Sequence, residues 1–150
     1  MKKLITIMTL ALAVIFGGLI NEAKAANSAD INSFTVKQNV WKNLQDGMVI
    51  TFYYTVHGMR GQNSRGEVTL YKADGSKIYL NNGQLAQYSL IWQNLGYDHV
   101  RIQNQWIFFP YNALKLPSGS NRIYAILRIY NATTGKLLKT SGKLQMTINR

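Results

Sequence analysis

The sequence contains no cysteine, and this absence excludes several kinds of protein. Disulfide bonds cannot staple the fold, although small exported domains often depend on them. A cysteine nucleophile, a thiolate metal centre and a lipid attached to an N-terminal cysteine are excluded as well. The folded chain must therefore obtain its stability from a hydrophobic core.

Acidic residues and histidines are also scarce. The chain has 6 Asp and Glu against 17 Lys and Arg, and it has 2 histidines. His57 and His99 lie about 40 residues apart and lack the spacing of a metal-binding motif. We therefore expect no metal site and no cofactor, and we interpret His57 as a solvent-exposed residue.

Catalytic motifs are missing too. A glycosidase divides acid and base roles between two carboxylates, but nothing in the sequence brings Glu67 and Asp98 together, and Asp46 and Asp74 precede glycines in turns. The Gly-x-Ser-x-Gly motif of serine hydrolases and the Gly-Lys-Ser/Thr ending of a phosphate-binding loop are absent. We predict that the protein is not an enzyme.

One long hydrophobic run is present, at the N-terminus. Two lysines precede an apolar stretch over residues 4–20, and Ala23-Lys24-Ala25 places small residues where a signal peptidase cleaves. A retained membrane anchor is the alternative, because about 20 apolar residues span a bilayer. We predict that residues 1–25 form a cleavable signal-peptide helix, that the protein is secreted or periplasmic, and that no membrane span remains after cleavage.

Cleavage would leave residues 26–150, which is enough for a single domain with a sizeable core. Since three lysines and one glutamate would be removed, 14 basic and 5 acidic residues would remain of the 17 and 6, a net charge of +9. Such an excess attracts acidic polymers such as lipopolysaccharide, acidic polysaccharide or DNA. The basic residues are scattered, so they do not form a nucleic-acid-binding tail. Solubility alone is the other explanation of the charge.

Short alternating segments broken by Gly, Asn and Asp indicate an all-β domain. The segment 48–56 alternates with period two, which predicts a strand with these core residues: Met48, Ile50, Phe52, Tyr54 and Val56. A second strand places Val68, Leu70 and Lys72 on one face, and the Asp74-Gly75 turn predicts a return strand over 77–80.

Further strands follow from the same pattern. Residues 122–130 should turn one face toward the core and the other outward; the inward set is Ile123, Ala125, Leu127 and Ile129. A turn at 131–135 leads to strands near 136–139 and 144–148, and weaker candidates lie at 31–40 and 106–109. About seven mostly antiparallel strands predict an immunoglobulin-like β-sandwich over residues 26–150, with a closed barrel as the alternative.

Residues 81–105 do not follow this rhythm. They are rich in Asn and Gln, and aromatic residues are interleaved among the amides. Unstructured stretches of this length are uncommon in compact domains and are often functional or contain a short strand, here expected near 88–92.

Three groups of residues carry a resemblance to a known family. They are Asn39-Val40 with Asp46-Gly47-Met48-Val49-Ile50-Thr51-Phe52 and His57-Gly58-Met59; Phe109-Pro110-Tyr111-Asn112-Ala113-Leu114; and Gly135-Lys136-Leu137-Leu138 with Thr140-Ser141-Gly142. In this order and spacing, the chain resembles a β-sandwich domain family of unknown function from secreted proteins of Bacteroidetes. The resemblance covers nearly all of residues 26–150. It implies a sandwich fold in a Gram-negative, host-associated setting, and it supplies no catalytic residues.

The aromatic and amide residues of the irregular segment suggest a carbohydrate site. Sugars pair an apolar face with a rim of hydroxyls, which suits aromatic platforms combined with side-chain amides. The candidate ligand-binding residues are Tyr88, Trp92, Tyr97 and Trp106. Burial of the tryptophans in the core is the alternative explanation.

Basic residues provide a second candidate surface. Arg60 and Arg65 flank a Gly- and Asn-rich loop, and Arg122 and Arg128 share one strand face with two tyrosines. Basic residues that alternate with aromatic ones can hold a charged chain, although an ordinary solvated sheet looks the same. The sequence therefore predicts an exported, non-catalytic binding domain whose ligand is an extracellular protein or a glycan. A surface protein that binds acidic polymers is the first alternative, and a small secreted hydrolase is the second.

Overall fold

The computed structural model describes residues 26–150, and the predicted signal peptide, residues 1–25, lies outside the described residues. The described part contains eight strands and one short 3₁₀ helix, η1. In chain order these are β1 Ser28–Lys42, β2 Gln45–His57, β3 Ser64–Lys72, β4 Gln87–Trp92, β5 His99–Pro110, η1 Tyr111–Ala113, β6 Ser120–Asn131, β7 Leu137–Thr140 and β8 Leu144–Asn149. Within residues 26–150, no helix is long and apolar enough to cross a membrane.

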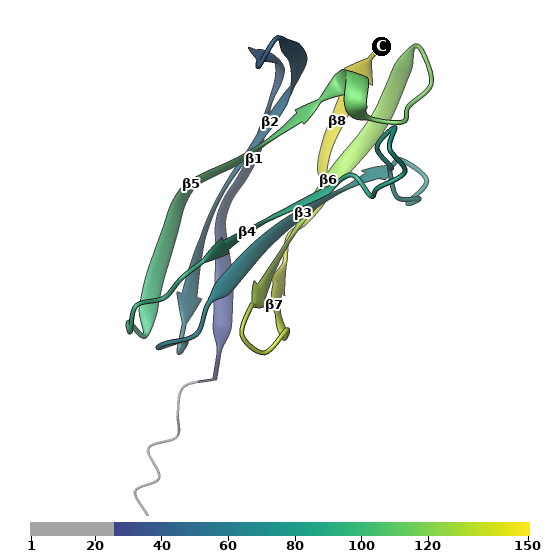
Figure 1. Ribbon diagram of the computed structural model, residues 1–150. Coiled ribbons are helices and arrows are strands. Elements are labelled where there is room, and N and C mark those ends of the chain that lie inside the picture. Colours follow the sequence, from purple (N-terminus) through teal and green to yellow (C-terminus); the bar gives the residue numbers. More distant parts are fainter. Residues whose placement is uncertain (1–25) are drawn as a thin grey trace, which may run out of the picture.

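The strands form two sheets that lie face to face (Figure 1). The smaller sheet has the order β1-β2-β5. The larger sheet has the order β4-β3-β6, and both β7 and β8 pair with the remaining edge of β6. All of these pairs are antiparallel. The fold is therefore an antiparallel β-sandwich, as the sequence predicts, rather than one closed sheet.

The number of strand positions also agrees with the prediction of about seven. β7 pairs with residues 128–130 of β6 and β8 with residues 120–125, so the two strands are halves of one sheet edge. Counted as one strand position, β7 and β8 correspond to strand G of an immunoglobulin-like domain. In the smaller sheet, β1, β2 and β5 correspond to A, B and E; in the larger sheet, β4, β3 and β6 correspond to C′, C and F. This division is of the immunoglobulin-like type.

The core lies between β2, the central strand of the smaller sheet, and β3 and β6, the two central strands of the larger sheet. All the core residues predicted for β2 are at most 1% exposed, and those predicted for β6 are at most 3% exposed. Successive side chains of a strand point to opposite faces, so strict alternation in the sequence was sufficient to identify both inner faces. Burial also raises the pKa of the Tyr54 hydroxyl, which hydrogen-bonds with Ser64 Oγ at 3.0 Å.

The predicted return strand over 77–80 forms only in part, because the structure has no continuous strand there. The turn itself is present, because the N–H of Gly75 donates to the carbonyl of Lys72. After the turn, Lys77 forms an antiparallel bridge with Tyr71, and the N–H of Ile78 donates to the carbonyl of Leu70 at 3.1 Å. Beyond this point the pairing with β3 stops, and Leu80 forms an isolated bridge with Leu114. Ile78 and Leu80 are buried instead and cover one end of the core. Burial of these two apolar side chains therefore decides the path of the chain, and Lys72 lies exposed at the end of β3.

The amide-rich segment contains more strand than the sequence indicates. β4 confirms the short strand expected near 88–92, but residues 99–105 also belong to a strand, β5. Asn104 has a positive φ of 54°, and three steps along β5 from Ile102 to Gln105 oppose two steps along β2. This extra residue is a β-bulge, which breaks the period-two pattern and hides the strand from sequence reasoning.

A substitution at Gly66 on β3 tests how closely the core is packed. A Cβ at this position would lie 2.8 Å from Cε2 of Phe52, whose ring is completely buried. We expect Gly66→Ala to lower the free energy of unfolding by about 1–3 kcal/mol through overpacking. Chemical denaturation measures this loss.

Gly142→Ala is the matched control, because in the described part of the chain no heavy atom beyond the two neighbouring residues lies within 4 Å of the added Cβ. The control should change stability by no more than about 0.5 kcal/mol. Equal effects of the two substitutions would contradict the packing described for Phe52.

Candidate functional site

Three connecting loops meet at one end of the sandwich, opposite the C-terminus (Figure 1). They are residues 58–63 between β2 and β3, residues 93–98 between β4 and β5, and residues 132–136 between β6 and β7. We call this part of the molecule the loop end. Loops displayed at one end of a rigid sandwich are a common place for binding residues.

Asn94 holds the 93–98 loop in place. Its side-chain NH₂ donates to the carbonyls of Met59 at 2.6 Å and Tyr97 at 2.8 Å. Its Oδ1 accepts hydrogen bonds from the backbone N–H groups of Gly96 at 3.1 Å and Tyr97 at 3.0 Å. Asn94 is only 8% exposed, so this amide organises the loop and is not free to contact a ligand.

The other two loops are tied by similar bonds. The N–H of Ala132 donates to the carbonyl of Asn63 at 2.7 Å, and the N–H of Asn63 donates to Thr133 Oγ1 at 3.0 Å. The side chain of Asn131, which is fully buried, donates to Gln62 Oε1. Buried polar groups with partners of this kind hold a loop in one conformation. The loop end is therefore an ordered platform.

This ordered end exposes large hydrophobic side chains. Ten such side chains are exposed in the described residues, and four of them come from the short segment 91–97: Ile91 at 63%, Trp92 at 45%, Leu95 at 87% and Tyr97 at 69%. We call these four residues the apolar segment. Single exposed apolar side chains are common, but a concentration of them usually marks a binding surface.

The structure brings three of the six predicted site residues to the loop end. Trp92 and Tyr97 belong to the apolar segment, and Arg60 lies in the 58–63 loop. Arg60 donates to the carboxylate of Asp98 from NH2 at 3.0 Å and from Nε at 3.3 Å. Both side chains are exposed, so this ion pair adds little stability, but it occupies the Arg60 guanidinium.

The remaining predicted site residues lie elsewhere. Tyr88 packs edge-on against Phe109, with ring centroids 5.0 Å apart. Trp106 is on the smaller sheet, where Lys42 Nζ lies 3.2 Å from the ring centroid. Trp106 is therefore apart from Trp92 and Tyr97, whereas Tyr88 lies on the same face of β4 as Trp92, four residues away.

Arg65 belongs to a second surface, on the outer face of the larger sheet. Its guanidinium lies 4.6 Å from the ring centroid of Tyr130, its register partner on β6. Further along the same face, Arg128 donates to Tyr71 Oη at 2.7 Å, and the Tyr71 ring stacks on Tyr124 at 5.2 Å. Basic and aromatic side chains thus alternate in space, as cation–π pairing favours. We call this surface the Arg–Tyr face, and Lys143 completes it 4.5 Å from the Tyr124 ring centroid.

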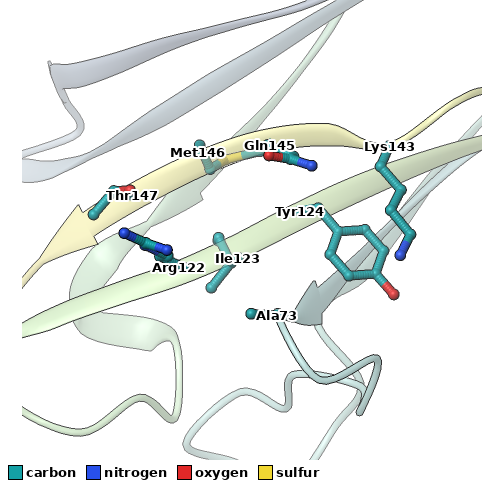
Figure 2. Close-up of a pocket in the computed structure, with 8 residues that line it drawn as sticks. All are labelled: Ala73, Arg122, Ile123, Tyr124, Lys143, Gln145, Met146 and Thr147. Atoms are coloured by element: carbon teal, nitrogen blue, oxygen red, sulfur yellow. The ribbon is translucent and has the colours of Figure 1, made fainter.

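A groove of about 430 Å³ adjoins the Arg–Tyr face (Figure 2). Its lining residues come from β6, from β8 with the residue before it, and from the turn after β3; they are Ala73, Arg122, Ile123, Tyr124, Lys143, Gln145, Met146 and Thr147. Figure 2 shows Arg122 and Thr147 at one end of the groove and Tyr124 and Lys143 at the other. Two cationic side chains and three neutral hydrogen-bonding side chains thus border one groove.

The two acids considered for catalysis lie on different elements. Glu67 is on β3, with Oε2 3.9 Å from Arg65 NH2, and Asp98 pairs with Arg60 at the loop end. Burial raises the pKa of the Tyr130 hydroxyl, and the negative charge of the nearby Glu67 carboxylate raises this pKa further. The absence of enzyme activity stays a prediction.

Sequence reasoning missed one pair of residues. His57 and His99 are register partners on β2 and β5, and their Nδ1 atoms lie 3.0 Å apart. No sequence signal links them, because the contact depends on sheet register. Within residues 26–150, no three His, Cys, Asp or Glu side chains form a cluster that could hold a metal ion.

Comparisons with known proteins do not assign a family. No protein-family model matches the chain, and no curated protein matches it. The X-ray structure of a Northeast Structural Genomics Consortium target is 8% identical with a TM-score of 0.27, over 85% of this chain and 89% of that chain. Bacteroides uniformis beta-glucuronidase 2, covalently bound to cyclophellitol-6-carboxylate aziridine, is 13% identical with a TM-score of 0.28; the match covers 88% of this chain but only 14% of that chain. Both TM-scores are too low to support an inference, and the resemblance to a Bacteroidetes family stays a prediction.

Substitution of Asn94 tests the organisation of the loop end. Asn94→Ala removes its side-chain hydrogen bonds and leaves the buried carbonyl of Met59 without this donor. We expect a loss of about 1–3 kcal/mol in unfolding free energy. We also expect much faster hydrogen exchange at the amides of Gly96 and Tyr97. Gln93→Ala, at the exposed neighbouring position, is the control and should change neither quantity; slow exchange retained in Asn94→Ala would contradict the role given to this amide.

Proposed function

We propose that this chain is an exported, non-catalytic domain that binds an extracellular protein through the apolar segment at its loop end. One observation carries the proposal: four large hydrophobic side chains are exposed within seven residues, two at the end of β4 and two in the following loop, which the buried Asn94 holds in place. A loop that is already ordered loses little conformational entropy when it binds a partner. An extracellular ligand follows from the predicted signal peptide.

The chemistry of the segment favours a protein ligand over a glycan. Trp92 and Tyr97 are residue types that dominate binding energy at protein interfaces. Leu95 and Ile91 are the most exposed and third most exposed members of the segment, and aliphatic side chains offer no flat ring for a sugar to stack on. The amides expected to bind sugar hydroxyls are partly consumed by the loop itself, as Asn94 shows.

A double substitution tests this surface. Leu95→Ser with Tyr97→Ala should weaken binding of the chain to its extracellular protein ligand at least tenfold, about 1.4 kcal/mol. Partners captured from a cell-surface protein extract by the wild-type chain would be identified, purified and measured by surface plasmon resonance. A glycan array probed in parallel distinguishes the two ligand classes.

The control carries equivalent changes at the opposite end of the molecule. Trp41 and Leu44 are 69% and 85% exposed near the turn between β1 and β2, and Trp41→Ala with Leu44→Ser should leave affinity unchanged. Equal loss in both double variants, or no loss in the first, would contradict the proposed surface. If the chain binds a glycan on the array and loses this binding with Trp92→Ala, the ligand is a glycan rather than a protein.

A second candidate function, binding of an acidic polymer, is supported by the Arg–Tyr face and its groove. Arg122 and Lys143 are both exposed beside the groove, and aromatic rings between the cations provide stacking surfaces for a sugar chain. Binding of this kind releases counterions and weakens steeply as salt rises.

Retention on immobilised heparin tests the acidic-polymer candidate. Arg122→Gln with Lys143→Gln should elute at clearly lower salt than the wild-type chain. Lys37→Gln with Arg101→Gln changes the net charge equally but alters two exposed residues of the smaller sheet, so it should shift elution much less. Equal shifts would show that net charge alone causes retention, and would remove the Arg–Tyr face as a site.

A further inference from the structure

Two histidines with metal-binding chemistry meet at the edge of the loop end, and one carboxylate hydrogen-bonds with the first of them. His57 is the last residue of β2 and His99 the first residue of β5, and they face each other as register partners. Their ring centroids are 4.7 Å apart, and their Nδ1 atoms are 3.0 Å apart. Asp30, on the adjacent strand β1, places Oδ2 3.0 Å from His57 Nε2.

The Asp30 carboxylate determines which nitrogen of His57 is free. A carboxylate accepts a hydrogen bond, so Nε2 of His57 carries the proton, and the Nδ1 of the neutral ring has a lone pair. This lone pair points toward His99 Nδ1. Metal-binding histidines commonly show this arrangement, in which a carboxylate holds one ring nitrogen and the other binds the ion.

The distance between the two nitrogens suits a shared metal ion. Two imidazole nitrogens that bind one tetrahedral Zn²⁺ at about 2.0–2.1 Å are separated by about 3.3 Å. The observed 3.0 Å is close to this value, so a small rotation of exposed side chains provides the geometry. Imidazole is a good ligand for Zn²⁺, Ni²⁺ and Cu²⁺.

We propose that His57 and His99 bind a divalent transition-metal ion such as Zn²⁺ through their Nδ1 atoms, with Asp30 as the positioning residue for His57. The chain supplies two ligands, and water would complete the coordination shell. Arg101 lies two residues from His99 on the same strand, so its positive charge opposes a cation on this face. We therefore expect affinity in the micromolar range rather than that of a closed structural zinc site.

The bound ion would join the end of β2 to the start of β5. These two strand ends flank the 58–63 and 93–98 loops, which already share a hydrogen bond from the N–H of Gly58 to the carbonyl of Asp98 at 2.7 Å. The ion would thus reinforce a contact beneath the loop end. The site is independent of the proposed function, because it involves none of the four residues of the apolar segment.

Titration with Zn²⁺ tests the site on chain that carries no affinity tag. We expect one saturable site by isothermal titration calorimetry, with chemical-shift changes centred on His57 and His99 in NMR spectra. His57→Ala and His99→Ala should each weaken binding at least tenfold. Asp30→Asn should weaken it about tenfold, as loss of a supporting carboxylate does elsewhere.

Asp74→Asn is the matched control, because Asp74 lies in an exposed turn and bonds only within it, to Ser76. This control should bind Zn²⁺ like the wild-type chain. If His57→Ala fails to fold, the more exposed His99→Ala and the Asp30→Asn variant carry the test. Absence of saturable binding would overturn the proposal, as would binding that survives in His99→Ala.

Discussion

The packing of the inner face of β2 against the inner faces of β3 and β6, in one hydrophobic core, is the constraint on which the rest of the structure depends. Without cysteine, no disulfide bond holds the two sheets together, so burial of alternate residues on these central strands supplies the cohesion. The same alternation determines which side chains point outward. On β6 this leaves Arg122, Arg128 and Tyr130 outside, and on β2 it places His57 beside β5. Both candidate surfaces built on strands are therefore consequences of the core.

Buried amides complete the fold where strands end. A loop at the end of a sandwich has backbone groups that no sheet pairs, and each unpaired buried group costs free energy. Asn94 and Asn131 satisfy several of these groups at once. Because hydrogen bonds rather than apolar contacts fix the 93–98 loop, its large hydrophobic side chains stay available at the surface. Because the buried amides hold the loop and the hydrophobic side chains remain exposed, the loop end is suited to binding a partner.

The accuracy of the sequence-based predictions follows the regularity of the pattern. The strands containing 48–56 and 122–130 alternate without interruption, and both inner faces are confirmed. The bulge at Asn104 interrupts β5, so half of that strand was missed. The segment 77–80 was predicted as the return strand of a hairpin, but its pairing with β3 ends after Ile78, and Ile78 and Leu80 are buried in the core. Local turn chemistry could not reveal this, because the decisive contacts are with distant residues.

The sequence by itself determined the all-β class, the inner faces of the central strands, the excess of positive charge and the lack of disulfide bonds, because these depend on composition and on a period of two residues. Only the tertiary structure decided which polar and aromatic residues meet. It placed Trp106 on a different sheet from Trp92, and it brought His57 to His99 across 42 positions of sequence. The physical reason is sheet register: a shift by one residue would turn every side chain to the opposite face, and no local pattern specifies the partner strand.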